Sequence, residues 1–334
     1  MLDQRDIARV VDLHRELILS KPNVVGVGIG FREVRGRRTD EICAVALVRQ
    51  KIPKAGLTPE ALVPSKIEGV STDVIQVGTL RAFADRTERQ RPVPGGVSVG
   101  HYKVTAGTLG GIVRDRSSGA RLVLSNNHVL ANSNDARPGD PILQPGPADG
   151  GRVARDMIAE LERFEPIEFS TGPGTCGLAE SYAKFGNAVG KILKSKHRIK
   201  VFQSDPEATN RIDAALAQPL DGVEILDEIL EIGVIGGVAP ASLGLNVRKS
   251  GRTTALTSGQ IIVLETTVNI QYGDRTARFE GQIVTGPMSE PGDSGSLLVV
   301  GDSLLAVGLL FAGSTQATVY NPIQEVLNGL EVMI

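Results

Sequence analysis

The chain contains no tryptophan, only two cysteines and no excess of charge of either sign. Cys43 and Cys176 stand far apart, so we expect neither a disulfide framework nor a paired-cysteine zinc site. With 36 basic against 38 acidic residues, no basic excess exists to bind a phosphate backbone, and we expect no nucleic-acid partner. No run reaches roughly 18 uninterrupted apolar residues, so we expect no membrane-spanning segment and take the cytoplasm as the default compartment.

Turn-forming residues are abundant, with 39 glycines and 18 prolines among 334 residues. After residue 104, short runs of apolar and β-branched residues alternate with Gly, Asp or Ser, which predicts a mainly β fold. A chain of this length is enough for two or three domains at about 100–200 residues each. The predicted strands are residues 110–114, 121–125, 246–250, 260–269, 276–284, 296–300, 304–312 and 317–320.

The first 80 residues predict a small α+β domain. Apolar residues at helical spacing indicate an amphipathic helix near residues 4–20, and strand-like runs follow at residues 24–32, 42–51 and 70–77. The charged stretch 33–41 is interpreted as the tip of a hairpin. The run GVGIG inside the first strand superficially resembles a phosphate-binding loop, but strand and not helix follows it, which favours close packing of the strand.

Residues 81–103 carry several arginines, acids and prolines without an apolar period, and this pattern favours a solvated linker. A partner-binding or protease-sensitive segment is the alternative. The remaining section, residues 104–334, contains enough strand for two barrels or sandwiches. It ends in an expected helix at residues 322–330, with proline at the first position.

The strongest chemical signal is EPGDSGS at residues 290–296, followed by an apolar strand. A serine hydroxyl becomes an effective nucleophile only when a neighbouring base removes its proton. It also needs backbone N–H groups turned toward the developing oxyanion, and glycine beside the serine permits that turn. Ser294 is therefore the candidate nucleophile, and a plain Gly-Asp-Ser-Gly turn is the alternative.

Among the four histidines, His128 is the best candidate for the base. It ends an apolar strand in the segment LSNNHVL, whereas His14 lies on the N-terminal helix, His101 in the expected linker and His197 in a basic run. Asp213, in RIDAAL, stands among apolar and small residues, so its carboxylate needs a hydrogen-bonding partner, which the imidazole N–H of His128 would supply. Taken alone, the histidine would more often be structural and the aspartate a turn or cap residue.

The order His, Asp, Ser and the motifs around these residues resemble the chymotrypsin-like (trypsin-fold) serine proteases over about residues 104–334. More narrowly, KSGRTT at residues 249–254 and the N-terminal α+β unit are similar to bacterial relatives of the plant narrow-leaf trypsin-like proteases. The resemblance implies two six-stranded β-barrels, over about residues 104–222 and 223–320, with the site at their junction.

The resemblance also implies the chemistry of the site. His128 would act as general base for Ser294, and Asp213 would orient the imidazole, in acyl transfer followed by hydrolysis without metal or cofactor. The backbone N–H groups of Gly292 and Ser294 would form the oxyanion hole. The implied partner is a protein or peptide substrate, and assembly into a homo-oligomer is left open. The alternatives are a non-peptidase hydrolase such as an esterase, and a catalytically silent scaffold or binding protein on the same fold.

Three features depart from the secreted members of this class: an expected lack of disulfides and signal peptide, a long insertion between His128 and Asp213, and an extra N-terminal domain. They bear on secretion, activation and substrate access, and they leave the three candidate residues in place. Specificity also differs, because trypsin-like enzymes that cut after Lys or Arg carry an acid six residues before the nucleophile. This chain has Met288 there, which predicts an apolar or small residue before the cleaved bond.

Digestive relatives are activated by a cut that frees an Ile-Val amine, which pairs with the aspartate before the serine. Ile112-Val113 and Asp293 resemble that pair. Ile112, however, stands only 16 residues before His128, inside the strand expected to open the first barrel. We therefore predict a full chain that is competent without this cut, in which internal donors satisfy Asp293.

Overall fold

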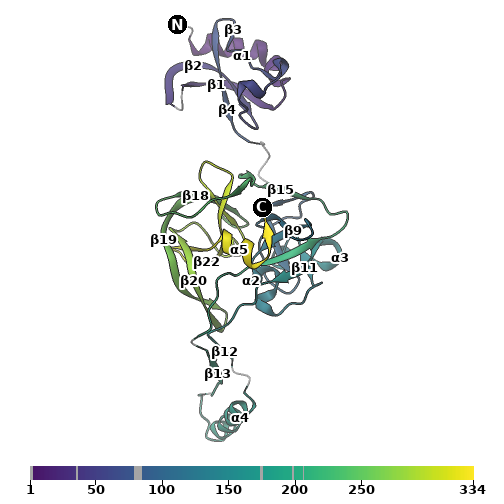
Figure 1. The fold of residues 1–334 in the computed structure, drawn as a ribbon, viewed down its shortest axis with the longest axis vertical. Helices are drawn as coiled ribbons and strands as arrows, with labels where there is room; N and C mark the ends of the chain where they lie inside the picture. The colour runs from purple at the N-terminus through teal and green to yellow at the C-terminus, as the bar shows by residue number, and fades with distance from the viewer. Residues whose placement is uncertain (1–2, 35–36, 79–84, 174–175, 198, 206) are drawn as a thin grey trace. The chain divides into compact units, whose positions relative to one another are not determined.

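The computed structural model describes residues 3–34, 37–78, 85–173, 176–197, 199–205 and 207–334. The chain divides into two compact units, Met1–Ala84 and Asp85–Ile334. The first is a small α+β unit, and the second contains two β-barrels (Figure 1). No helix within the described ranges is long and apolar enough to cross a membrane.

In the first unit, one helix packs on a four-stranded sheet of order β1-β2-β4-β3. Asp3 caps the helix by accepting hydrogen bonds from the backbone N–H groups of Arg5 and Asp6, and one apolar face of the helix, including Ile18, is buried. The elements are α1 (Gln4–Leu19), β1 (Val24–Val34), β2 (Arg37–Val48), η1 (Lys54–Gly56), η2 (Pro59–Ala61), β3 (Lys66–Ile67) and β4 (Val70–Gln76). The predicted α+β composition of this region is confirmed.

Close packing accounts for the glycine-rich run in β1. A Cβ on Gly26 would approach the Leu47 side chain to 3.0 Å, and a Cβ on Gly30 would approach Val45 to 2.9 Å. The run continues as strand, as expected, and both contacts are with β2.

The β1–β2 hairpin is tighter than expected. The strands extend through most of the charged stretch 33–41, because charged side chains can lie on the solvent side of a strand and pair across it. Arg32 and Glu41 form such a pair at 2.9 Å.

The first barrel of the second unit is a sheet of order β24-β8-β9-β14-β11-β10-β6-β7. Its interior is an apolar cluster that includes Val123, Ile142 and Ile158. The strands are β6 (Ser98–His101), β7 (Gly107–Thr108), β8 (Gly111–Asp115), β9 (Arg121–Ser125), β10 (Pro141–Leu143), β11 (Met157–Phe164), β14 (Ala215–Pro219) and β24 (Val332–Met333). The connections contain α2 (Asn127–Leu130), η3 (Asn132–Asn134), η4 (Pro147–Asp149), α3 (Val153–Asp156) and α4 (Gly177–Ile192).

The second barrel is a sheet of order β13-β12-β20-β19-β18-β21-β22-β17, with β23 pairing β20 and β22. Its strands are β12 (Thr171–Pro173), β13 (Phe202–Ser204), β17 (Gly237–Val238), β18 (Asn246–Gly251), β19 (Ala255–Tyr272), β20 (Arg275–Thr285), β21 (Leu297–Val300), β22 (Leu305–Gly313) and β23 (Thr318–Pro322). A further sheet of order β16-β15-β5 contains β5 (Val93–Gly95), β15 (Ile225–Ile229) and β16 (Gly233–Val234).

A shared apolar layer joins the two barrels. It contains side chains of β9 and β14 from the first barrel, of β21 and β22 from the second, and of the closing helix α5 (Ile323–Gly329). The expected two-barrel architecture is confirmed. More than six strands are assigned to each sheet because two- and three-residue edge segments join it. Pro322 precedes α5 as its N-cap and does not occupy the first helical position.

The expected linker at residues 81–103 is too long. Residues 81–84 lie outside the described residues, and from Asp85 onward the chain belongs to the barrel unit, with β5 and β6 in this stretch. Arg86 is buried and donates to the carbonyl of Gly96 at 2.9 Å and to Ser250 Oγ at 2.7 Å. His101 is also buried, and its Nε2 lies 3.1 Å from Asp140 Oδ2. A sequence does not distinguish such paired charges from solvated ones, because their partners lie far away along the chain.

Candidate active site

His128 stands on the short helix α2, which begins directly after β9. The two asparagines before it fix this turn to other parts of the first barrel. Asn126 Nδ2 donates to the carbonyl of Asp213 at 2.7 Å, and Asn127 Nδ2 donates to the carbonyl of Glu165 at 2.6 Å. The Asn-Asn pair is thus a visible sequence signal for the position of the histidine, although the sequence analysis did not use it.

Asp213 is fully buried just before β14, which pairs with β9. Its Oδ2 accepts a hydrogen bond from His128 Nδ1 at 2.6 Å, and its Oδ1 accepts one from the backbone N–H of His128 at 3.2 Å. The backbone N–H of Asp213 donates to Asn321 Oδ1 at 3.0 Å. The predicted histidine–aspartate hydrogen bond is confirmed. With the Nδ1 proton directed at the carboxylate, Nε2 keeps the lone pair that a general base needs.

Tyr272, at the end of β19, is a further group on this carboxylate. Its hydroxyl donates to Asp213 Oδ2 at 2.7 Å, and its ring lies edge-on to His128 with 5.9 Å between centroids. Burial and then the charge of Asp213 raise the pKa of Tyr272 well above its ordinary value, so the hydroxyl keeps its proton and donates it. The sequence analysis missed this residue, since no local pattern connects groups 59 positions apart.

Ser294 lies in a loop whose shape requires glycine at two positions. Gly292 and Gly295 have φ values of 101° and 97°, which favour glycine. A Cβ on Gly295 would lie 2.2 Å from Ser125 Oγ, and one on Gly292 would lie 2.5 Å from Thr253 Oγ1. The two glycines of GDSGS therefore allow the loop to approach its neighbours closely.

The serine and histidine segments meet beside β7. The backbone N–H of Thr108 donates to the carbonyl of Ser294 at 2.7 Å. A Cβ on Gly107 would contact both the side chain of Val129, at 2.4 Å, and the carbonyl oxygen of Ser294, at 3.0 Å. Val129 directly follows His128, so the backbone segments that carry His128 and Ser294 meet at the junction of the barrels. Among the described residues, no hydrogen bond joins the Ser294 hydroxyl to His128 Nε2, whereas His128 and Asp213 are bonded directly. His128 and Asp213 come from the first barrel, and Ser294 comes from the loop before β21 of the second.

The backbone N–H groups of Gly292 and Ser294 have no hydrogen-bond acceptor among the described residues. Both residues are half-buried, so these N–H groups remain accessible to an oxygen atom from outside the chain. They have the chemical character that an oxyanion hole requires, and that role for Gly292 and Ser294 stays a prediction.

Asp293 is fully buried and fixes the loop through five donors. They are the backbone N–H groups of Thr253, Thr254 and Glu290, the Thr254 hydroxyl at 2.6 Å and Lys249 Nζ at 3.1 Å. Burial opposes ionisation, but the ammonium of Lys249 and these hydrogen bonds hold the pKa of Asp293 below its ordinary value. The prediction that internal donors satisfy Asp293 is confirmed, and the KSGRTT segment supplies four of the five.

Met288, the predicted floor of the substrate pocket, is buried in the apolar interior of the second barrel. Its backbone N–H donates to Thr318 Oγ1 at 3.0 Å, and its sulfur lies 3.6 Å from the hydroxyl of Tyr320. Its role in specificity stays a prediction.

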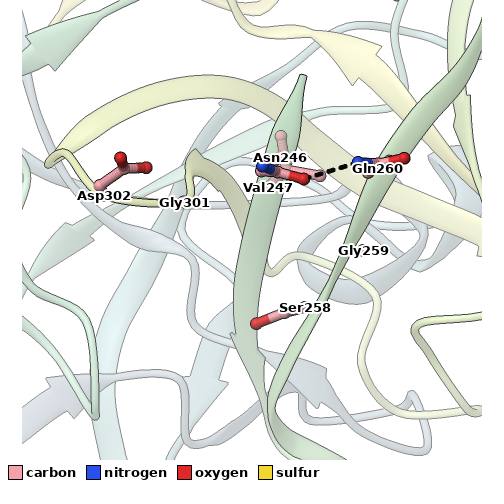
Figure 2. A pocket seen from close by; sticks show the side chains of 7 residues that line it. All are labelled: Asn246, Val247, Ser258, Gly259, Gln260, Gly301 and Asp302. Carbon is pink, nitrogen blue, oxygen red and sulfur yellow. Dashed lines mark hydrogen bonds between the residues drawn. The ribbon is translucent and has the colours of Figure 1, made fainter. Parts of the chain in front are cut away.

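A hollow lies on the second barrel, between β18, β19 and the turn after β21 (Figure 2). Asn246 and Gln260 are hydrogen-bonded at 2.8 Å across it. None of the candidate residues lines it; the lining residues are Asn246, Val247, Ser258, Gly259, Gln260, Gly301 and Asp302. Within the part of the chain that the structure describes, no group of three or more His, Cys, Asp or Glu residues is placed to hold a metal ion.

No family model matches the chain. It is 23% identical to Protein NARROW LEAF 1 of Oryza sativa subsp. japonica over 328 residues, which covers 87% of this chain and 51% of that protein. It is 42% identical to Serine protease 2 of Streptomyces fradiae over 80 residues, or 24% of this chain and 43% of that protein. The chain thus spans about half the length, or less, of these curated relatives.

Among solved structures, a Nocardiopsis protease aligns with a TM-score of 0.46 and 17% identity, over 72% of this chain and 97% of that one. The fold of the barrel unit is established by its own two packed sheets, with the histidine, aspartate and serine segments at their junction. It is a mainly β fold of two packed barrels, and the curated relatives that match short stretches of this chain, such as Serine protease 2, are serine proteases.

Proposed function

We propose that this chain is a serine endopeptidase that hydrolyses peptide bonds through an acyl-enzyme on Ser294. The observation that carries the proposal is the buried Asp213 carboxylate, bonded at 2.6 Å to a histidine whose segment meets that of the serine. A buried, paired carboxylate of this kind orients the imidazole and stabilises the imidazolium that forms when the base accepts a proton.

In the acylation step, Ser294 Oγ attacks the substrate carbonyl carbon while its proton passes to His128 Nε2. The carbonyl electron pair moves onto oxygen, and the N–H groups of Gly292 and Ser294 stabilise the resulting oxyanion. Collapse of this intermediate expels the amine, which takes the proton from His128. The product is an ester on Ser294.

In the deacylation step, water attacks the ester carbonyl and gives its proton to His128. Collapse of the second tetrahedral intermediate releases the carboxylic acid and returns the proton to Ser294 Oγ. Asp213 accepts hydrogen bonds at both oxygens and holds the imidazole in one orientation through both steps.

Labelling by a fluorophosphonate probe tests the assembled site, because the probe reacts with an activated serine. We expect the full chain to be labelled at Ser294 and the Ser294→Ala variant to stay unlabelled. Unlabelled full chain would instead support a silent scaffold. Cleavage of casein and of a peptide library, measured beside hydrolysis of simple esters, separates an endopeptidase from an esterase.

The specificity proposal follows from Met288, whose thioether carries no charge to pair with a substrate cation. We expect a peptide library to be cut after apolar or small residues. Preferential cutting after arginine would contradict this proposal without affecting the assignment of the nucleophile.

We also propose that the chain is a relative of the narrow-leaf proteases and acts inside the cell. The relationship to the narrow-leaf proteases is supported by a similarity that extends over most of the chain. Action inside the cell is supported by two free cysteines, Cys43 and Cys176, which lie in different units. Mapping of new protein termini in cells that contain active enzyme or Ser294→Ala, combined with cell fractionation, tests substrate and compartment together.

A further inference from the structure

We propose that Tyr272 is a positioning residue of the active site, which holds the Asp213 carboxylate from the second barrel and thereby sets the orientation and basicity of His128. This inference rests on the proposed function, because it assigns a role within the same reaction. Tyr272 touches neither Ser294 nor the proposed oxyanion hole in any contact described above, so it acts through the aspartate.

The geometry places two donors on one carboxylate oxygen. Asp213 Oδ2 accepts from His128 Nδ1 at 2.6 Å and from the Tyr272 hydroxyl at 2.7 Å, while Oδ1 accepts from the backbone of His128. Both oxygens are therefore held, and the carboxylate cannot rotate without breaking a hydrogen bond.

The tyrosine is itself held rigidly. It ends β19 opposite Arg275 of β20, and its ring lies edge-on to Phe169 at 5.8 Å and tilted against Phe279 at 6.3 Å. The Tyr272–Asp213 hydrogen bond also crosses from the second barrel to the first. The barrel that carries the serine loop and the barrel that carries the aspartate are thus joined at Asp213.

The hydroxyl affects basicity as well as geometry. A donor on Oδ2 withdraws negative charge from the carboxylate, so less of that charge stabilises a protonated imidazole. Loss of the hydroxyl leaves Oδ2 with the imidazole as its side-chain donor, which strengthens the interaction with imidazolium. The acidic limb of the pH–rate profile should therefore move to higher pH when the hydroxyl is removed.

Two other charged residues lie near these elements. Arg275 lies over the Phe169 ring and pairs with Asp135. Glu165 is bonded through its backbone to Ala214 and Asn127, and burial raises the pKa of its carboxyl group. Behind the serine loop, Asp293 pairs with Lys249 and Asp149 with Arg252. None of these ion pairs includes Tyr272, so removal of its hydroxyl leaves them intact and changes the hydrogen bonding of Asp213 directly.

Tyr272→Phe keeps the ring and removes the hydroxyl. We expect kcat to fall about tenfold with KM within about twofold, and the acidic limb of the pH profile of kcat/KM to move up by about 0.5 unit. Tyr102→Phe is the matched control, since Tyr102 lies beside His101 and Lys103, and it should behave as the unmodified chain. A Tyr272→Phe profile that superimposes on the control would overturn the proposal.

A second readout does not depend on activity. The Nδ1 proton of His128, hydrogen-bonded to a carboxylate, gives a far-downfield proton resonance, which should shift in Tyr272→Phe and stay in place in Tyr102→Phe. An unshifted resonance in Tyr272→Phe overturns the proposal even if the variant is less active. If Tyr272→Phe shows the expected shift yet the full chain fails to label with fluorophosphonate, the proposed function fails while the positioning role of Tyr272 stands.

Discussion

At the scale of single residues, the candidate site depends on hydrogen bonds that orient one imidazole. Asp213 holds the ring of His128 and its backbone, and Asn126 holds the carbonyl of Asp213. Asp213 and Asn126 are fully buried, where a lost hydrogen bond leaves an unsatisfied atom, whereas the His128 side chain is partly exposed. Orientation is thus achieved by side chains that are distant in sequence and adjacent in space.

Substitution of the triad should show that its members act as one unit. Ser294→Ala, His128→Ala and Asp213→Asn are each expected to lower kcat by about a thousandfold or more, with double variants little worse than the single ones. The reason is that the serine is a poor nucleophile once any member is lost. Steady-state kinetics with a peptide substrate measure this. If Ser294→Ala kept more than about a tenth of the activity, the loss would be below about 1.4 kcal/mol and the nucleophile would be misassigned.

At the scale of elements, the loop that carries Ser294 is fixed by the KSGRTT segment at the end of β18. Lys249 supplies a positive charge to the buried Asp293, which is the interaction that a freed N-terminal amine supplies in digestive relatives. Ile112, the residue such a cut would free, is paired with Val123 inside β8 and β9. The buried Asp293 is therefore paired with an ammonium from within the chain, and we predict that no freed N-terminus is needed.

Removal of Lys249 should leave Asp293 as an unpaired buried charge. We expect Lys249→Met to lower the free energy of unfolding by about 3–5 kcal/mol and to slow fluorophosphonate labelling. The double variant Lys249→Met/Asp293→Asn removes both charges and should recover part of the stability. Denaturant unfolding and labelling rates measure both effects. Equal stability of the single and double variants would show that the pair does not interact.

The unprocessed chain should be the competent form. Intact-mass analysis of the probe-labelled protein is expected to show the label on the full-length mass, since a cut before Ile112 would break the pairing of β8 with β9. Label found solely on a chain that begins at Ile112 would contradict the prediction.

At the scale of the whole molecule, the chain has two units with separate apolar cores. The cluster around α1 belongs to the first unit, and the clusters inside and between the barrels belong to the second. All residues of the candidate site lie in the second unit. The first unit is therefore expected to influence regulation or partner choice more than the chemistry at Ser294.

Paired core substitutions test this separation. Ile18→Ala, in the first unit, and Ile142→Ala, inside the first barrel, should each cost about 2–5 kcal/mol in the unit that contains them. Labelling of Ser294 should persist in Ile18→Ala and decline in Ile142→Ala at temperatures near the transition. Thermal unfolding followed with labelling at each temperature measures both. Equal loss of labelling in the two variants would show that the units fold as one.

Local patterns in the sequence determined much of this protein. Alternation of apolar and turn residues predicted the β-rich section. GDSGS, LSNNHVL and RIDAAL predicted Ser294, His128 and Asp213 through their order along the chain and their resemblance to the trypsin-fold proteases. Residues 81–103 have no apolar period and were predicted to form a solvated linker, but β6 in this stretch is buried. The helix α4 in the insertion was not predicted.

Only the tertiary structure decided which distant groups share a site. Tyr272 reaches Asp213 because the β19–β20 hairpin returns to the first barrel, and Lys249 reaches Asp293 because β18 and β21 are neighbours in one sheet. Arg86 is buried for the same reason, since its partners Gly96, Ser250 and Glu231 are assembled by the barrel. Charge compensation in a folded chain depends on distance in space, and a sequence specifies that distance only through the complete packing of its strands.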